Sequence, residues 1–348
     1  EASKSFNGLI KNNPTAAYIF ELLKTEQTEE YNDAVFSMTI PKGWKVTCGG
    51  SDIYHSIRIS DPDEPLNCMF VLLKADCLLH SQEGKDAWKA VYNEGNRDAV
   101  IFANAPVLEK PSTESFFKIF AQYADMASKF EAAYVGYSFP HYDNFIVTDR
   151  FSGSGDMVKY SLGDEFLRAT FTDNGRAGEG MFSASVVDFK ESLYSDRTVA
   201  DYGLESVDSG YYMAYNIVAI TAAKDTFIEW EDLLTECLKT LKYSDIFENN
   251  IRGAIERDFF QARCINQNFD QTMDGIMSSW DSRNKSIDII SQKQSDATLG
   301  YERVYDTRTK EIYRAAKGFT GSYKGKGYKP VTDDNMYTTP ISGYIEKD

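Results

Sequence analysis

The segment from Phe36 to Val46, Phe-Ser-Met-Thr-Ile-Pro-Lys-Gly-Trp-Lys-Val, constrains the fold more than any other stretch of the chain. Apolar side chains at positions 36, 38 and 40 alternate with polar ones, which is the period of a strand with one buried face. Pro41 ends the strand because proline has no N–H to donate, and Gly43 allows the backbone to turn. The segment therefore predicts a strand, a sharp corner and a second strand that leaves the corner.

The charge balance excludes one class of partner. The 348-residue chain carries a formal charge of −16 and has a pI near 4.7, so a nucleic-acid backbone would be repelled. We therefore expect no nucleic-acid partner. The charge is unevenly distributed, because residues 285–348 hold 11 Lys and Arg against 9 Asp and Glu. The tail thus differs in composition from the acidic remainder of the chain.

The apolar content predicts a folded chain without a membrane-spanning helix. Hydrophobic residues make up 42% of the sequence, enough to bury a sizeable core. No run approaches the roughly 20 apolar residues that a spanning helix needs. The chain begins at Glu1 rather than Met, which is typical of a processed start, and a lipid-anchoring cysteine would lie upstream of it. We expect membrane association only through such an N-terminal lipid anchor.

Helices and strands are predicted in a defined order. Asn13-Pro14 opens an N-terminal helix that we assign to residues 1–30. Two helices follow at 86–94 and 112–130, the second with an aromatic stripe at helical spacing. Strands are expected at 145–151, 166–172, 181–189 and 211–222, with a hairpin turn at Asp173-Asn-Gly175. A final amphipathic helix begins at Thr226, which we expect to form a capping box with Glu229.

This order, with its Phe-x-x-x-Ile-Pro-x-Gly-Trp strand and corner and its last helix ending Leu238-Lys-Thr-Leu-Lys-Tyr-Ser244, resembles the PsbP/MOG1-like α/β/α sandwich domains. The resemblance covers about residues 31–245. It implies an α+β fold in which an antiparallel sheet is layered with helices. It also implies a non-catalytic role in binding or assembly, because most members of the family are not enzymes. No set of functional residues is carried over by the resemblance.

The remainder of the chain is predicted to form an extension. Residues 246–285 read as a helical connector, and residues 286–348 as a β extension rich in Tyr, Gly and Lys. Gly300 to Arg314 alternates and turns at 306–310, which indicates a hairpin. The tail, with Ser295-Asp-Ala-Thr-Leu-Gly-Tyr301, resembles the ends of secreted or lipid-anchored proteins of Gram-positive bacteria. That resemblance implies a location at the cell surface and no particular chemistry.

The sequence offers few residues for catalysis or metal binding. Its three histidines show no metal-ligand spacing, and its five cysteines include no Cys-x-x-Cys pair, so no cofactor is predicted. Cys48 or Cys77 could act with His141 as a nucleophilic pair only if the fold brings them together. A bridge between Cys68 and Cys77 remains open. The carboxylates Asp61, Asp63 and Glu64 could hold a hard cation, although a solvated hairpin turn explains them better.

Two classes of function therefore compete. The first is a non-enzymatic, exported binding or assembly protein of the cell surface, with a protein or cell-envelope ligand. Its binding surface would use tyrosines of the tail, because tyrosine is enriched at interfaces: Tyr301, Tyr305, Tyr313, Tyr323, Tyr328 and Tyr337. These tyrosines could equally well pack a small Gly-rich sheet. The second class is an envelope hydrolase that uses the Cys/His pair or paired carboxylates. A deep pocket with His141 beside a thiol would favour the hydrolase, and a tyrosine-lined face would favour binding.

Overall fold

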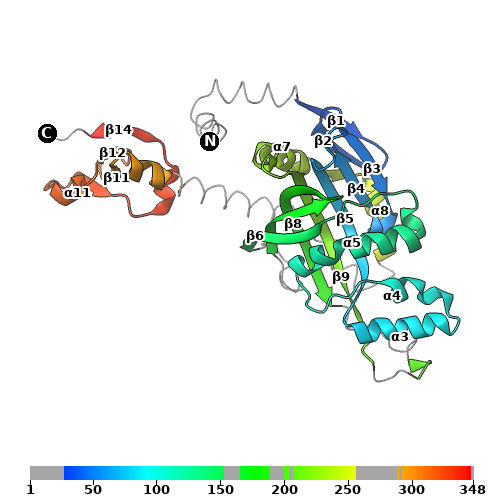
Figure 1. Cartoon of the computed structure of the whole chain (residues 1–348). Coiled ribbons are helices and arrows are strands. Elements are labelled where there is room, and N and C mark those ends of the chain that lie inside the picture. Colours follow the sequence, from blue (N-terminus) through cyan, green and yellow to red (C-terminus); the bar gives the residue numbers. More distant parts are fainter. Residues whose placement is uncertain are drawn as a thin grey trace. The chain divides into compact units, whose positions relative to one another are not determined.

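The computed structural model describes residues 27–152, 165–188, 200–203, 207–255, 289 and 292–345 (Figure 1). Contacts between residues divide the chain into two units. We call the one that contains residues 27–255 the main unit, and the one that contains residues 289–345 the C-terminal unit. Among the described residues, no helix is long and apolar enough to cross a membrane. The fold is α+β with antiparallel sheets, as the sequence predicted.

The main unit is built on a seven-stranded antiparallel sheet of order β3-β4-β5-β9-β8-β7-β6. The Asp173-Asn-Gly175 turn is confirmed as the link between two of these strands, and both Asn174 and Gly175 have positive φ. Such a turn matches the twist of the strands that it joins. The strands are β3 (Lys45–Gly49), β4 (Ser56–Ser60), β5 (Cys68–Leu79), β6 (Asp143–Ser152), β7 (Glu165–Asp173), β8 (Arg176–Asp188) and β9 (Tyr211–Ala223).

The corner after Pro41 transfers the chain from one sheet to another. The strand before it, β2 (Phe36–Pro41), lies in a three-stranded sheet between β1 (Thr28–Asn32) and β10 (Lys242–Tyr243). Its alternating apolar side chains are buried, as predicted. Gly43 has a φ of 81°, and the Trp44 ring packs 5.4 Å from that of Trp230. The corner is therefore fixed between the two sheets by a buried aromatic contact.

Helices cover both faces of the large sheet. The aromatic side of α5 (Thr113–Phe130) packs on one face, where Phe117 and Phe120 join a core with Leu167 and Ala169 of β7. Arg168 lies between those two strand residues and therefore points to the other face. There its guanidinium lies 3.7 Å from a carboxylate oxygen of Glu231 and 5.3 Å from the Phe227 ring, both on α7 (Phe227–Lys239).

Two further helices of the main unit pack against each other beside strand β5. Ser81 caps α3 (Gln82–Asn93) by accepting a hydrogen bond from Gly84 N, and Trp88 of this helix stacks on Phe102 at 4.4 Å. The short elements are α4 (Val100–Asn104) and the 3₁₀ turns η1 (Asp52–Tyr54), η2 (Arg97–Ala99) and η3 (Ala132–Tyr134).

Three boundary predictions need correction or completion. Residues 28–30 belong to β1 rather than to a helix, because they pair with β2, and residues 1–26 of the predicted N-terminal helix lie outside the described residues. Thr226 does precede α7, but its hydroxyl donates to the carbonyl of Ala223 instead of accepting from the helix, so the capping box is wrong. The predicted connector begins as α8 (Asp245–Ile255), and residues 256–285 lie outside the described part.

The C-terminal unit, coloured orange to red in Figure 1, contains a four-stranded sheet of order β13-β11-β12-β14. The predicted hairpin is confirmed as β11 (Tyr301–Asp306) and β12 (Ile312–Ala316). Asp306 accepts a hydrogen bond from Arg308 N in the turn. The other elements are a helical stretch at residues 292–298, α11 (Phe319–Ser322), β13 (Tyr328–Pro330), the 3₁₀ turn η5 (Asp334–Thr338) and β14 (Ile341–Ile345), which runs parallel to β12.

Candidate functional site

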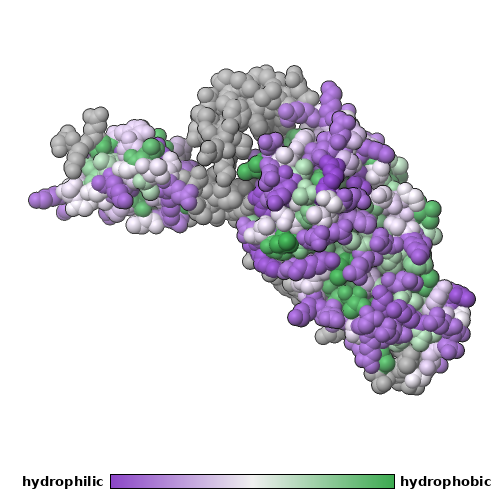
Figure 2. All heavy atoms as spheres, viewed as in Figure 1, coloured by the Kyte–Doolittle hydropathy of each residue, from purple (hydrophilic) through white to green (hydrophobic). Residues whose placement is uncertain are grey.

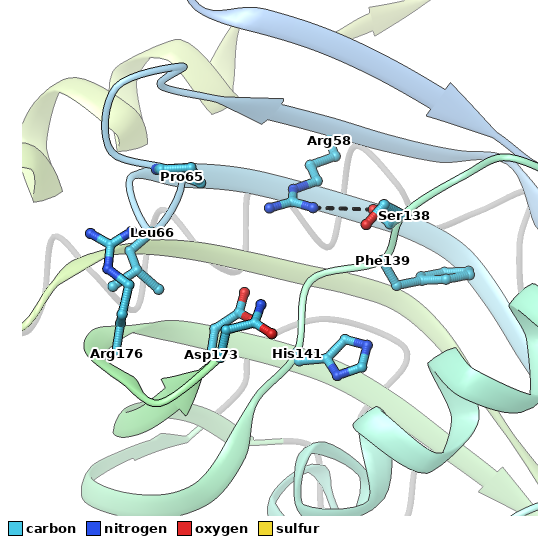
Figure 3. Close-up of a pocket in the computed structure, with 9 residues that line it drawn as sticks. Arg58, Pro65, Leu66, Ser138, Phe139, His141, Asp173 and Arg176 are labelled. Carbon is cyan, nitrogen blue, oxygen red and sulfur yellow. Dashed lines mark hydrogen bonds between the residues drawn. The ribbon is translucent and has the colours of Figure 1, made fainter.

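The structure does not bring the predicted nucleophiles to the predicted base. Cys48 lies on β3 opposite Ile57, and Cys77 lies on β5 at a bulge where the pairing with β9 shifts. His141 lies just before β6, where its Nε2 is 3.8 Å from a carboxylate oxygen of Asp125. His141 also lines a cavity of about 390 Å³ (Figure 3), but no cysteine lines it. The arrangement that would favour a hydrolase is therefore not found among the described residues.

The thiols are also poorly suited to nucleophilic attack. The Cys48 side chain is solvent-exposed, but desolvation by the atoms packed around it, followed by the charge of Asp33, still raises the pKa of its thiol to about 11. Burial, followed by the charge of Asp76, raises the pKa of the Cys77 thiol well above its usual value. A high pKa leaves little thiolate at neutral pH, and thiolate is the reactive form. Cys68 and Cys77 are both free, so the bridge between them is not formed.

The acidic residues between β4 and β5 serve the turn. Asp61 accepts hydrogen bonds from Asp63 N and from the side-chain amide of Asn67, and Glu64 accepts one from Leu66 N. Glu64 also pairs with Arg176. These contacts use the carboxylate oxygens that a cation would need. Among the described residues, no group of three or more His, Cys, Asp or Glu side chains is placed to hold a metal ion.

The six tyrosines of the tail lie on two faces of the C-terminal sheet. The register pairs Val304 with Tyr313 and Asp306 with Tyr328, which places both tyrosines on one face. Because side chains alternate along a strand, Tyr301 and Tyr305 of β11 belong to the other face. Tyr337 also belongs there, since its ring lies 4.6 Å from the guanidinium of the β11 residue Arg303. The predicted surface is therefore divided, and all six tyrosines are half-buried.

One face carries an aromatic cluster, which we define as Tyr313, Phe319, Tyr323 and Tyr328. Tyr328 occupies its centre, with ring centroids 5.6 Å from Tyr323, 6.1 Å from Phe319 and 6.2 Å from Tyr313. Phe319 and Tyr323 stack at 5.1 Å. Gly325 permits this packing, because a Cβ at that position would lie only 2.2 Å from the Tyr323 hydroxyl oxygen. The rings support one another and still keep part of their surface exposed.

Basic side chains are frequent in the segment that carries the aromatic cluster, although Arg314 and Lys329 belong to the opposite face of the sheet. Arg308 is close enough to Tyr328 and Tyr323 to interact electrostatically with both hydroxyls. Residues 306–330 contain only two acidic side chains, Asp306 and Glu311, and the Asp306 carboxylate pairs with Arg308. The basic side chains in this range are Arg308, Lys310, Arg314, Lys317, Lys324, Lys326 and Lys329. The aromatic cluster therefore lies in the most cationic region that the structure describes in this unit.

The opposite face of the sheet is organised by a buried ion cluster. Asp296, in the helical stretch at 292–298, accepts hydrogen bonds from Arg303 Nε at 2.6 Å and from Arg314 Nε at 2.7 Å. Arg303 also donates to the carbonyl of Tyr337 and to the side chain of Gln292. Asp296 and Arg303 are almost fully buried. This cluster holds the helical stretch and the 3₁₀ turn on the sheet, so this face is structural.

A buried ionic cluster in the main unit was not predicted from the sequence. The Lys74 ammonium is 2.8 Å from Asp76, whose carboxylate also accepts a hydrogen bond from the Tyr54 hydroxyl at 3.0 Å. Glu131 interacts electrostatically with this pair, and burial followed by the charge of Asp76 raises the pKa of Glu131 to about 7. Lys74 and Asp76 interrupt an otherwise apolar strand, and this interruption is the signal that could have indicated the cluster.

Exposed apolar side chains do not gather on one element. Figure 2 shows hydrophilic residues over most of the visible surface, with hydrophobic residues in separate spots. The most exposed large apolar residues, Val135, Ile146, Ile246 and Leu299, come from different segments. Comparison with protein-family models and with curated proteins gave no match. The aromatic cluster and the cavity beside His141 are therefore the two candidate sites, and both rest on geometry alone.

Proposed function

We propose that this protein is a non-enzymatic binding protein of the cell envelope, exported and held at the cell surface by an N-terminal lipid anchor. The aromatic cluster of the C-terminal unit supplies its binding surface. The observation that carries this proposal is the packing of four half-exposed rings within a segment that is strongly cationic in an otherwise acidic chain. Such a surface suits an acidic polymer of the cell envelope.

Physical chemistry supports each part of this surface. Aromatic rings offer a large contact area at a low cost in conformational entropy, and tyrosine hydroxyls add hydrogen bonds. The lysines at 324 and 326 attract an anionic ligand and accelerate its association. The rings of the aromatic cluster are fixed by mutual packing and by Gly325, so little ordering is required on binding.

The main unit has the role of a scaffold in this proposal. Its antiparallel sheet with helices on both faces supports our assignment of residues 31–245 to the PsbP/MOG1-like domains, whose members are mostly binding or assembly proteins. The hydrolase alternative has less support, because the Cys48 and Cys77 thiols have raised pKa values and no cysteine of the described residues lines the cavity beside His141.

Co-sedimentation tests the binding surface. The probe is purified Gram-positive cell walls that either keep their anionic phosphate polymers or have lost them by chemical extraction. The full chain should sediment with the first preparation and much less with the second, and added salt should weaken the binding. Tyr328→Ala should reduce affinity at least about tenfold, as expected for a central interface aromatic residue. The double variant Lys324→Gln/Lys326→Gln should lose most of the salt dependence.

Tyr344→Ala is the matched control, because Tyr344 is highly exposed but pairs with Arg314 on the opposite face. Equal sedimentation of wild type, Tyr328→Ala and Tyr344→Ala would contradict the proposed surface. The location is tested separately by protease treatment of intact source cells. Release of the chain from a membrane-associated pool would support export, whereas a chain that stays protected and cytosolic would overturn it.

A further inference from the structure

The cavity beside His141 lies in the main unit and is formed by four separate segments. Arg58 comes from β4, Pro65 and Leu66 from the β4–β5 turn, and the stretch 138–141 from the connection before β6. The fourth segment is the β7–β8 turn, which contributes Asp173, Asn174 and Arg176. Its volume of about 390 Å³ is within the range of small-molecule sites.

Arg58 contacts the Cys68 thiol and the Ser138 carbonyl, and no carboxylate of the described residues pairs with its guanidinium. Its Nη1 donates to the carbonyl of Ser138 at 3.2 Å, and its Nε is buried without a hydrogen-bond partner. A guanidinium carries five N–H donors in a planar arrangement that suits a carboxylate. Figure 3 shows the Arg58 guanidinium on the upper side of the cavity. The guanidinium therefore brings a positive charge and N–H donors to the lining of the cavity.

Asp173 lies on the opposite side of the same cavity (Figure 3). Its Oδ1 accepts a hydrogen bond from the side-chain amide of Asn174 at 2.8 Å, so the carboxylate is oriented by the turn. Within the part of the chain that the structure describes, Arg58 and Asp173 form no ion pair with each other. Arg176, the other cation of the lining, is already paired with Glu64. Opposite charges thus face one cavity without neutralising each other.

This arrangement selects among classes of ligand. A simple anion attracted by Arg58 would be repelled by Asp173, and a simple cation would be repelled by Arg58. A ligand that carries both charges satisfies both groups. The lining also includes Pro65, Leu66 and Phe139, which suit an apolar side chain. We propose that this cavity binds a small zwitterion, an apolar α-amino acid or short peptide, with its carboxylate on Arg58 and its ammonium group on Asp173.

The proposed site is independent of the aromatic cluster, which belongs to the other unit. It therefore adds a second binding activity, and either proposal can fail without the other. His141 lines the same cavity and adds a further polar side chain to its wall.

Isothermal titration calorimetry on the full chain tests the zwitterion site. The probes are leucine, leucyl-leucine, N-acetyl-leucine, which lacks the ammonium group, and leucinamide, which lacks the carboxylate. We expect leucine or leucyl-leucine to bind. The tighter of the two shows whether the ligand is a free amino acid or a short peptide. Each blocked analogue should bind at least about tenfold more weakly, because one charged hydrogen-bonding group is lost. Equal binding of N-acetyl-leucine, or no binding by either zwitterion, would overturn the proposal.

Substitutions locate the site. Asp173→Asn and Arg58→Gln should each weaken zwitterion binding by a similar factor. The matched controls Asp98→Asn and Arg97→Gln, on an exposed 3₁₀ turn that does not line the cavity, should leave it unchanged. Asp173 lies at a turn, so the Asp173→Asn variant should fold. It therefore tests the site even if Arg58→Gln, which changes a partly buried side chain, does not fold. Retention of full affinity in Asp173→Asn would contradict the assignment of the ammonium group.

Discussion

The Lys74 ammonium lies 2.8 Å from the Asp76 carboxylate, and the two residues are two positions apart on strand β5. The Lys74 side chain is 0% exposed and that of Asp76 is 14% exposed. Residues at this spacing share one face of a strand. The strand bulges next to the pair, because Cys77 has a φ of 60° and its N–H donates to the other oxygen of Asp76. The ion pair and the bulge therefore stabilise each other.

Removal of the cation should be costly. We expect Lys74→Met to lower the free energy of unfolding by roughly 3 kcal/mol, since it leaves a partly buried carboxylate without its cation. Urea denaturation of the full chain measures the change. The control is Lys74→Met/Asp76→Asn, which keeps one acceptor oxygen for the Cys77 N–H but removes the charge of residue 76. This double variant should be more stable than Lys74→Met. If it is less stable, the ion pair does not account for the loss.

A pH dependence should follow from Glu131. Its pKa is raised from 4.5 to about 7 in the folded chain, by burial first and by Asp76 second. As pH rises from about 4.5 to 7, the unfolded chain releases the proton while the folded chain keeps it. Stability from this group is therefore greatest below pH 4.5 and falls until about pH 7. The loss amounts to about 2 to 3 kcal/mol.

Glu131→Gln should remove this contribution. The difference in unfolding free energy between the variant and the wild type should grow in favour of the variant from about pH 4.5 to pH 7 and then stay constant. Asp125→Asn, a more exposed acid on α5, serves as the control and should show a much smaller pH-dependent difference. Parallel pH profiles of wild type and Glu131→Gln would show that Glu131 is already ionised in the folded chain.

The elements of the fold could be predicted wherever local chemistry decides the structure. The alternation around Met38, the aromatic stripe of the helix predicted at 112–130 and the turn at Asn174 each specify their own conformation, and all three are observed. The capping role of Thr226 failed because its hydroxyl found a nearer acceptor in the preceding carbonyl of Ala223. Such a competition between two backbone groups is not visible in the spacing of residues.

The candidate sites depended on contacts between distant segments. Arg58 and Asp173 face one cavity only because the β4–β5 and β7–β8 turns meet there, and no local pattern indicates that meeting. The division of the tyrosines between two faces follows from strand register, which was predicted only for the hairpin. The sequence suggested tyrosines of the tail for the proposed binding surface but did not indicate which of them share a face.

Cysteine reactivity distinguishes a binding protein from a cysteine hydrolase. Cys264 lies outside the described residues, so it is first replaced in a Cys264→Ser variant. Labelling of this native variant with iodoacetamide at about pH 8 should be slow at the four other cysteines. A pKa near 11 at Cys48 reduces its thiolate about 100-fold relative to the ordinary value of 9.0. Mass spectrometry of labelled peptides measures the rates, and the urea-unfolded chain is the reference. Rapid labelling of native Cys48 or Cys77 would support the hypothesis that one of them is the nucleophile of a hydrolase.

The stability of the C-terminal unit should depend on Asp296. Its carboxylate bridges two guanidinium groups, and the Arg303 side chain is 0% exposed. We expect Asp296→Asn to destabilise this unit by roughly 3 to 5 kcal/mol, because two cations lose their counter-charge in a buried site. Hydrogen exchange at β11 and β12 should report the loss as faster exchange. Asp334→Asn is the matched control: Asp334 pairs with Lys293 at 2.6 Å in an exposed position, where an ion pair contributes less than about 1 kcal/mol. If both variants exchange alike, the buried ion cluster does not hold the sheet, and the packing around Val304 and Ala315 must do so instead.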